Sequence, residues 1–204
     1  MADRLYLSLW FPNFRLQSLA TAMVSVIKQF SGDGSEPQVH AAAAYPLSWN
    51  ETPLYQRIYE KDEVQEATPE RAVAAATENL HDDYAYEFEV KWDLWQAETV
   101  GGLDATWKQE PVTVRVVGFG PEFDDGAYEQ NGHIRVDFGL DTPFLQDEVD
   151  LDEVNAEYIK RNVQRMVDVT NAIQQNCGIS SRLLWSESGE NLAQKLIARL
   201  QRVN

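Results

Sequence analysis

Cysteine is nearly absent from this chain of 204 residues, and long hydrophobic runs are absent altogether. The single cysteine, Cys177, has no second cysteine to pair with, which excludes an intrachain disulfide. No stretch reaches the roughly 18 apolar residues that indicate a transmembrane helix, so we expect no membrane span. The first residues carry no basic segment, and Pro12 interrupts the apolar run that starts at Leu5, which is not the pattern of a signal peptide. These absences predict a cytoplasmic location.

Motifs for catalysis and cofactor binding are also missing. The chain has no Walker-type phosphate loop, no G-x-S-x-G nucleophile elbow and no H-E-x-x-H zinc motif. The pair Gly118 and Gly120 lacks the third glycine of a dinucleotide-binding loop, and the acids that follow Pro121 would repel a phosphate. The three histidines lie on separate predicted elements, and one cysteine cannot complete a zinc site. We therefore expect no cofactor and no metal.

Positive charge is scarce compared with negative charge. The chain has 17 Lys and Arg residues against 33 Asp and Glu residues, for a formal net charge of −16. Between Pro121 and Glu157, twelve carboxylates stand against Arg135 alone, so this segment carries a net charge of −11. A local excess of this kind repels nucleic acid and anionic membranes and attracts basic surfaces. We therefore expect a basic protein as partner, and neither nucleic acid nor a membrane.

The first half of the chain has the pattern of an α+β fold. Hydrophobic residues make up 44 % of the chain and aromatic residues 11 %, which is too many for a disordered acidic protein. Apolar runs and alternation predict strands, whereas three- and four-residue spacing of apolar side chains predicts helices. The resulting order β-α-β-β-α-β is that of a ferredoxin-like fold. The predicted strands cover 5–11, 39–47, 54–60 and 86–94, and the helices cover 14–30 and a segment that begins at Thr68.

The second half predicts the order β-β-α-β-α, packed against the first half or extending it. A loop from Glu98 to Pro111 separates the halves, and it contains two adjacent glycines. The long helix has Asp152 as its N-cap and Gly178 just after its end. We expect one α+β domain over 1–204, or two tightly packed subdomains, 1–98 and 111–204. The predicted elements are strands 112–117, 133–138 and 182–186, a helix over 153–176 and a last helix capped by Ser188.

The charge pattern favours a non-enzymatic interaction protein of the inhibitor or immunity-like kind. Carboxylates would steer a basic partner into contact, and aromatic side chains would anchor it. Alternation places Trp95 on the solvated face of its strand, where it is either such an anchor or covered by a neighbouring helix or loop. The expected partner-binding residues are Glu122, Asp124, Asp125, Tyr128, Asp137, Asp141 and Trp95.

Two alternatives remain open. The first is a small-molecule or divalent-metal-dependent enzyme, because His133, Arg135 and Asp137 would share one strand face under period-two geometry. In that case His133 would carry the proton, and Glu122 and Asp141 would add carboxylates. The second is a self-assembling structural subunit. Its last helix has a basic stripe, Lys195, Arg199 and Arg202, which would meet the acidic segment of another copy.

Overall fold

A single antiparallel sheet of seven strands runs through the structure, in the order β3-β2-β4-β5-β6-β1-β7. The computed structural model describes residues 2–31, 36–100, 104–146, 152–189 and 192–201. Helices and strands occur in similar proportion, which confirms the α+β class. No helix within these ranges is long and apolar enough to span a bilayer.

The elements of the first half match the predicted segments closely up to β4. Helical structure fills the predicted range 14–30 from Leu16 onward, as helix α1 flanked by two 3-10 turns. Helix α2 begins at Pro69, which is favourable at the first turn because its missing N–H would have no partner there. The bounds are β1 (Arg4–Trp10), α1 (Leu19–Ile27), β2 (Val39–Pro46), β3 (Tyr55–Ile58), α2 (Pro69–Ala76) and β4 (Tyr84–Val100).

The second half also has the predicted kinds of element, with two short helices in addition. The Asp152 side chain accepts a hydrogen bond from the N–H of Asn155, which confirms it as the N-cap of the long helix. Gly178 follows the end of that helix with a left-handed φ of 65°. The bounds are β5 (Asp104–Phe119), α3 (Ala127–Gln130), β6 (Ile134–Leu140), α4 (Thr142–Leu145), α5 (Glu153–Asn176), β7 (Ser181–Ser186) and α6 (Leu192–Gln201).

The ferredoxin-like arrangement of the first half is not confirmed. Strand β1 pairs with β6 and β7 of the second half, and not with β2, β3 or β4. The reason lies in the chain connections: β4, β5 and β6 follow one another as antiparallel neighbours, so β1 joins the sheet beyond β6. The second half therefore extends the same sheet.

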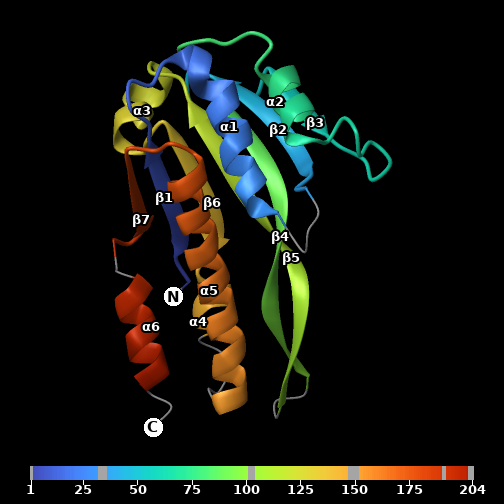
Figure 1. The fold of residues 1–204 in the computed structure, drawn as a ribbon, viewed down its shortest axis with the longest axis vertical. Helices are drawn as coiled ribbons and strands as arrows, with labels where there is room; N and C mark the ends of the chain where they lie inside the picture. Colours follow the sequence, from blue (N-terminus) through green and yellow to red (C-terminus); the bar gives the residue numbers. More distant parts are fainter. Residues whose placement is uncertain (1, 32–35, 101–103, 147–151, 190–191, 202–204) are drawn as a thin grey trace.

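The predicted loop from Glu98 to Pro111 is wrong for most of its length. These residues belong to β4 and β5, which pair from Ala85 opposite Phe119 as far as Val100 opposite Asp104. Residues 101–103, with the two glycines, lie outside the described residues. Figure 1 shows this hairpin extending well past the other strands, beside α5.

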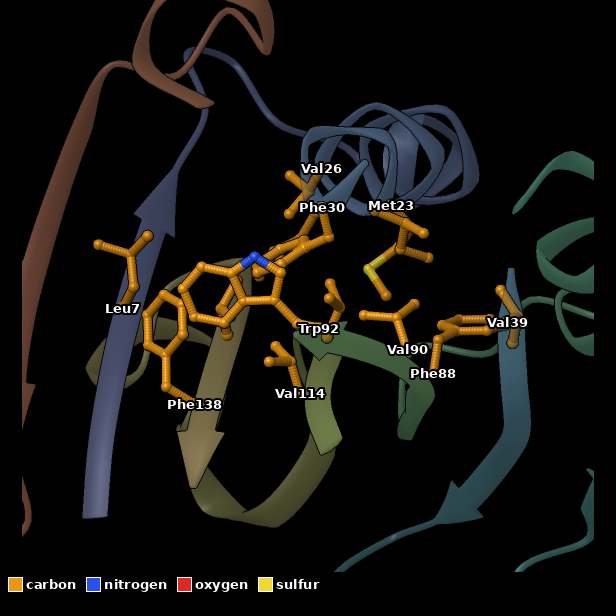
Figure 2. Close-up of a cluster of buried hydrophobic side chains, with 14 of the residues drawn as sticks. Leu7, Met23, Val26, Phe30, Val39, Phe88, Val90, Trp92, Val114 and Phe138 are labelled. Atoms are coloured by element: carbon orange, nitrogen blue, oxygen red, sulfur yellow. The ribbon is translucent and has the colours of Figure 1, made fainter. Parts of the chain in front are cut away.

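Helices α1, α2 and α5 cover one face of the sheet (Figure 1). The main core lies between this face and the helices, with Trp92 near its centre (Figure 2). The Trp92 ring lies 5.8 Å from the rings of both Phe30 and Phe138. Gly118 lets α1 approach β5, because a Cβ there would lie 2.6 Å from Leu19 Cδ1. Within the described ranges, no helix packs over most of the width of the other face, where a groove opens instead.

A smaller apolar cluster covers one end of that other face. Phe119 and Phe123 are fully buried there, and Trp49 packs edge-on against both rings. Tyr45 lies 5.2 Å from Trp49. The cluster fixes the loops after β2 and β5 against the sheet, and both loops contribute to the surfaces described next.

Candidate functional site

The face of the sheet opposite α1 and α5 carries charged side chains in two neighbouring rows. Strand register sets these rows, because residues paired on adjacent strands point to the same side of the sheet. We call the surface that both rows form the open face. The first row, the Glu89 row, consists of Ile58, Ala41, Glu89, Arg115, Asp137, Tyr6 and Trp185, from β3 to β7. The second row, the Glu87 row, consists of Gln56, Ala43, Glu87, Val117, Arg135, Ser8 and Leu183.

The charges of the Glu89 row are compensated by ion pairs. Arg115 Nε donates to Glu89 Oε1 at 2.9 Å. The neighbouring Arg4 Nη1 donates to Asp137 Oδ2 at 3.0 Å. Asp137 is buried, and its other oxygen accepts the backbone N–H of Gly139 at 2.8 Å. Both oxygens of this carboxylate are therefore engaged within the chain.

The two charges of the Glu87 row have weaker partners. The guanidinium carbon of Arg135 lies 5.0 Å from the centre of the Tyr6 ring and 5.3 Å from that of Phe119. Its buried Nε has no hydrogen-bond partner among the described residues. The Glu87 side chain is 19 % exposed, and Arg115 Nε is 3.9 Å from Glu87 Oε1. Burial lowers the pKa of the Arg135 guanidinium and raises the pKa of the Glu87 carboxyl, because both charged forms lose water.

A groove of about 570 Å³ opens over the two rows. Its lining includes Ala41 and Ala43 of β2, whose small side chains leave room above the sheet. Tyr45 and Trp49 line it as well, and both charged rows contribute acids and arginines. A volume of a few hundred Å³ is typical of small-molecule sites. The groove can therefore hold a small ligand that presents charged groups to the sheet.

Loops that carry carboxylates meet where β4 begins and β5 ends. The N–H of Glu122 donates to the Asp82 carbonyl at 2.8 Å, and the N–H of Asp124 donates to the Leu47 carbonyl at 2.9 Å. The N–H of Leu47 in turn donates to the Asp83 carbonyl at 2.7 Å. These bonds join three loops. We call the carboxylates of these loops and of the adjoining α3 the acidic end: Asp82, Asp83, Glu122, Asp124, Asp125 and Glu129.

The acidic end is a fixed cluster of uncompensated charge. Among the residues that the structure describes, its six carboxylates have no ion-pair partner. Gly120 allows the loops to meet, since a Cβ there would lie 2.3 Å from the Asp82 carbonyl oxygen. Asp124 and Asp125 adopt left-handed φ values of 48° and 44°, which cost free energy in a non-glycine residue. The surrounding contacts therefore fix the backbone of the loops that carry these carboxylates.

His133 lies just before β6 and is surrounded by aromatic rings. Its ring stacks on Phe14 at 4.4 Å and lies 4.5 Å from the ring of Tyr128. Its Nδ1 accepts the backbone N–H of Phe11 at 3.0 Å. Burial lowers the pKa of His133 and so favours the neutral ring. These contacts give His133 a packing role, and they engage one of its two ring nitrogens.

The seven residues expected to bind a partner lie in several different places. Glu122, Asp124 and Asp125 belong to the acidic end, whereas Tyr128 is half-buried against His133. Trp95 is half-buried as well, because Tyr158 of α5 lies 4.8 Å from its ring. Helix α5 therefore covers part of the Trp95 ring. The remaining two, Asp137 and Asp141, are buried.

Asp141 belongs to an internal ion cluster between the chain ends. Lys195 Nζ of α6 lies 3.2 Å from Asp141 Oδ2 and 3.3 Å from Asp3 Oδ2. Hydrogen bonds from Ser188 hold the pKa of Asp3 down at about 2. Lys195 of the predicted basic stripe therefore forms ion pairs within its own chain. Arg202 of that stripe lies outside the described residues.

The sequence patterns did not identify Arg4 and Arg115, which line the groove beside Arg135. They also did not identify Asp82 and Asp83, which lie just before β4 in the acidic end. Alternation in segment 86–94 predicts that Glu87 and Glu89 share a face, but register across the sheet is needed to place Arg115 and Arg4 opposite them. Nothing in the described ranges brings three or more His, Cys, Asp or Glu side chains together in a way that could hold a metal ion.

Comparison of the chain with protein-family models, with curated protein sequences and with solved structures found no match.

Proposed function

We propose that this chain is an interaction protein that binds a basic protein partner through the acidic end. One observation carries the proposal: loops and a short helix that bear six carboxylates lie at one end of the sheet, joined by backbone hydrogen bonds between the loops, and none of the six has an ion-pair partner among the described residues. Asp137 forms an ion pair with Arg4, and Asp141 forms one with Lys195. These two carboxylates are therefore not part of the proposed surface.

Physical chemistry gives such a surface a defined role. Carboxylates that lack internal partners create a field that steers a basic protein toward the site and raises the association rate. Leu47 lies in the same loop cluster and is 57 % exposed. An exposed apolar side chain in a loop bonded to acidic loops suits a partner that has basic residues beside a small apolar contact.

The test begins with identification of the partner by position-specific cross-linking. A photoreactive group replaces Gln130, beside the acidic end, and in a second sample it replaces Gln164, an exposed residue of α5. A partner captured at the first position only is then purified. Its association rate is measured from low to physiological salt, with wild type and with a triple variant, Glu122→Gln, Asp124→Asn and Asp125→Asn.

We expect the association rate to fall steeply as salt rises, and the triple variant to associate at least about tenfold more slowly at low salt. The control is a second triple variant that removes the same charge elsewhere: Glu66→Gln, Glu78→Gln and Glu157→Gln. An association rate that ignores ionic strength, or an equal loss in both triple variants, would rule out steering by the acidic end.

The two alternative functions have less support. We do not extend the proposal to catalysis by His133, because aromatic rings surround it and Phe11 occupies its Nδ1. We do not extend it to self-assembly through α6, because Lys195 already pairs with Asp3 and Asp141.

A further inference from the structure

We propose that the groove over the open face binds a small zwitterion, an ω-amino acid whose carboxylate pairs with Arg135 and whose ammonium pairs with Glu87. This site is separate from the acidic end, and the inference does not depend on the protein partner. It rests on the position, burial and incomplete pairing of these two side chains in one groove.

Register places the two charges opposite each other across one strand. Glu87 of β4 pairs with Val117 of β5, and Val117 pairs with Arg135 of β6. Strands in a sheet are about 4.8 Å apart, so the two backbones are separated by roughly 10 Å. Val117 between them is buried and apolar, so no charged group stands in the row between the carboxylate and the guanidinium. A ligand that spans the strand can reach both charges.

The other charges of the groove are already satisfied. Arg115 donates to Glu89, and Arg4 donates to Asp137. Arg135, by contrast, packs against the Tyr6 and Phe119 rings, feels Asp137 and Glu87 without forming an ion pair with either, and has a buried Nε without an acceptor in the described part of the chain. A ligand carboxylate offers the acceptor that this guanidinium lacks, since Arg and carboxylate form forked hydrogen bonds.

Glu87 likewise lacks a partner, in its case a hydrogen-bond donor. It accepts no hydrogen bond from any described residue, and its nearest cation, Arg115, is already committed to Glu89. Partial burial of a carboxylate without a donor costs free energy, so a ligand ammonium would stabilise Glu87. Burial also raises the pKa of Glu87, as expected for a carboxylate whose negative charge is not fully compensated by a cation. The methylene chain would cross β5 above Val117, and the Tyr45 and Trp49 rings, which line the groove and pack on the same apolar cluster as Val117, offer it apolar contacts.

The ligand class follows from these contacts. A molecule with only one charge would pair with either Arg135 or Glu87 and leave the other side chain without a partner. A molecule with both charges at its ends satisfies both, and the length of its methylene chain must match the span between the side-chain tips. The matching probes are glycine, β-alanine, 4-aminobutyrate and 6-aminohexanoate, with butyrate and butylamine as singly charged controls.

Calorimetric titration of the whole chain with each probe at neutral pH tests the proposal. We expect one length of ω-amino acid to bind in the millimolar range or better, and butyrate and butylamine to bind at least about tenfold more weakly. Arg135→Gln and Glu87→Gln should each weaken the best probe by about tenfold or more. Arg71→Gln, which removes an exposed guanidinium from α2, should leave the affinity unchanged.

Two further measurements test the proposal even if Arg135→Gln or Glu87→Gln fails to fold. Ala43→Leu adds volume to the groove directly beside Glu87 without changing its charge, and it should also abolish binding. Backbone amide shifts in wild type should change at Glu87, Val117 and Arg135 when the best probe is added. Absence of binding by all four ω-amino acids up to about 10 mM would overturn the proposal, as would binding that Arg135→Gln and Ala43→Leu both leave intact.

Discussion

Asn162 of α5 binds both backbone polar groups of Trp95 in β4. Its side-chain oxygen accepts the Trp95 N–H at 2.8 Å, and its amide nitrogen donates to the Trp95 carbonyl at 2.8 Å. The same nitrogen donates to the Pro143 carbonyl at 2.7 Å. Strand β2 pairs with β4 only as far as Val90, so Asn162 supplies the bonds that a neighbouring strand would otherwise make. One buried side chain thus fastens the β4–β5 hairpin to the helix beside it.

Replacement of Asn162 by alanine should be severely destabilising. Three hydrogen bonds disappear, and the polar backbone atoms of Trp95 and Pro143 lose their partner in a buried place. We expect a loss of roughly 2–4 kcal/mol in the free energy of unfolding, measured by urea denaturation. The control is Asn176→Ala on the same helix, whose hydrogen bond to Gln29 is exposed. Similar losses in both variants would contradict this account of Asn162.

Lys195 should be needed to hold α6 against the sheet. Its ammonium compensates Asp141, whose side chain is only 2 % exposed. Lys195→Met leaves that buried carboxylate without its cation, and the expected loss of stability is about 3–5 kcal/mol. Lys160→Met removes an exposed ion pair with Glu157 and should change stability by less than about 1 kcal/mol. Adding Asp141→Asn to Lys195→Met should restore part of the loss, and failure to do so would contradict the role of the buried charge.

Glu87 should lower stability at neutral pH. Burial raises its pKa in the folded protein above the ordinary value of 4.5, so the folded state disfavours the ionised carboxylate. Glu87→Gln should therefore raise Tm at pH 7. As the pH falls through the raised pKa, the folded wild type takes up a proton, and the gap between the proteins should close below about pH 4.5.

Glu89→Gln is the matched control for that experiment, because Glu89 lies on the same strand face but accepts a hydrogen bond from Arg115. It should leave Tm unchanged or lower it at pH 7. A difference between Glu87→Gln and wild type that is the same at pH 4 and pH 7 would show that ionisation of Glu87 is not its cause.

Gly120 should be required for the geometry of the acidic end. A methyl group there would lie 2.3 Å from the backbone oxygen of Asp82, so one of the two loops must move. We expect Gly120→Ala to cost about 1–3 kcal/mol and to speed hydrogen exchange at the Glu122 amide, which donates to that oxygen. Gly118→Ala should cost less, because its methyl group meets the ends of flexible side chains of Leu19 and Met23. Slow exchange at Glu122 in Gly120→Ala would contradict the close contact.

The sequence by itself determined most of the local structure. Alternation in segment 86–94 gave a strand with one buried face, and Asp152 with Gly178 marked the two ends of α5, because these are short-range preferences of the backbone. Alternation also placed Glu87 and Glu89 on one side. The long acidic segment indicated a charged surface, although it did not indicate which carboxylates would remain uncompensated.

Only the tertiary structure decided what pairs with what. Strand β1 lies between β6 and β7, because long-range register is set by packing of whole elements and leaves no local signature. The same register brings Arg115 beside Glu89 and leaves Arg135 and Glu87 with incomplete partners. It also buries Asp137 and Asp141 in ion pairs, while Asp82 and Asp83 join the acidic end from 40 residues earlier in the chain than Glu122. The sequence determines where the charged residues stand along the chain, whereas the compensation of their charges depends on contacts between residues far apart in the chain.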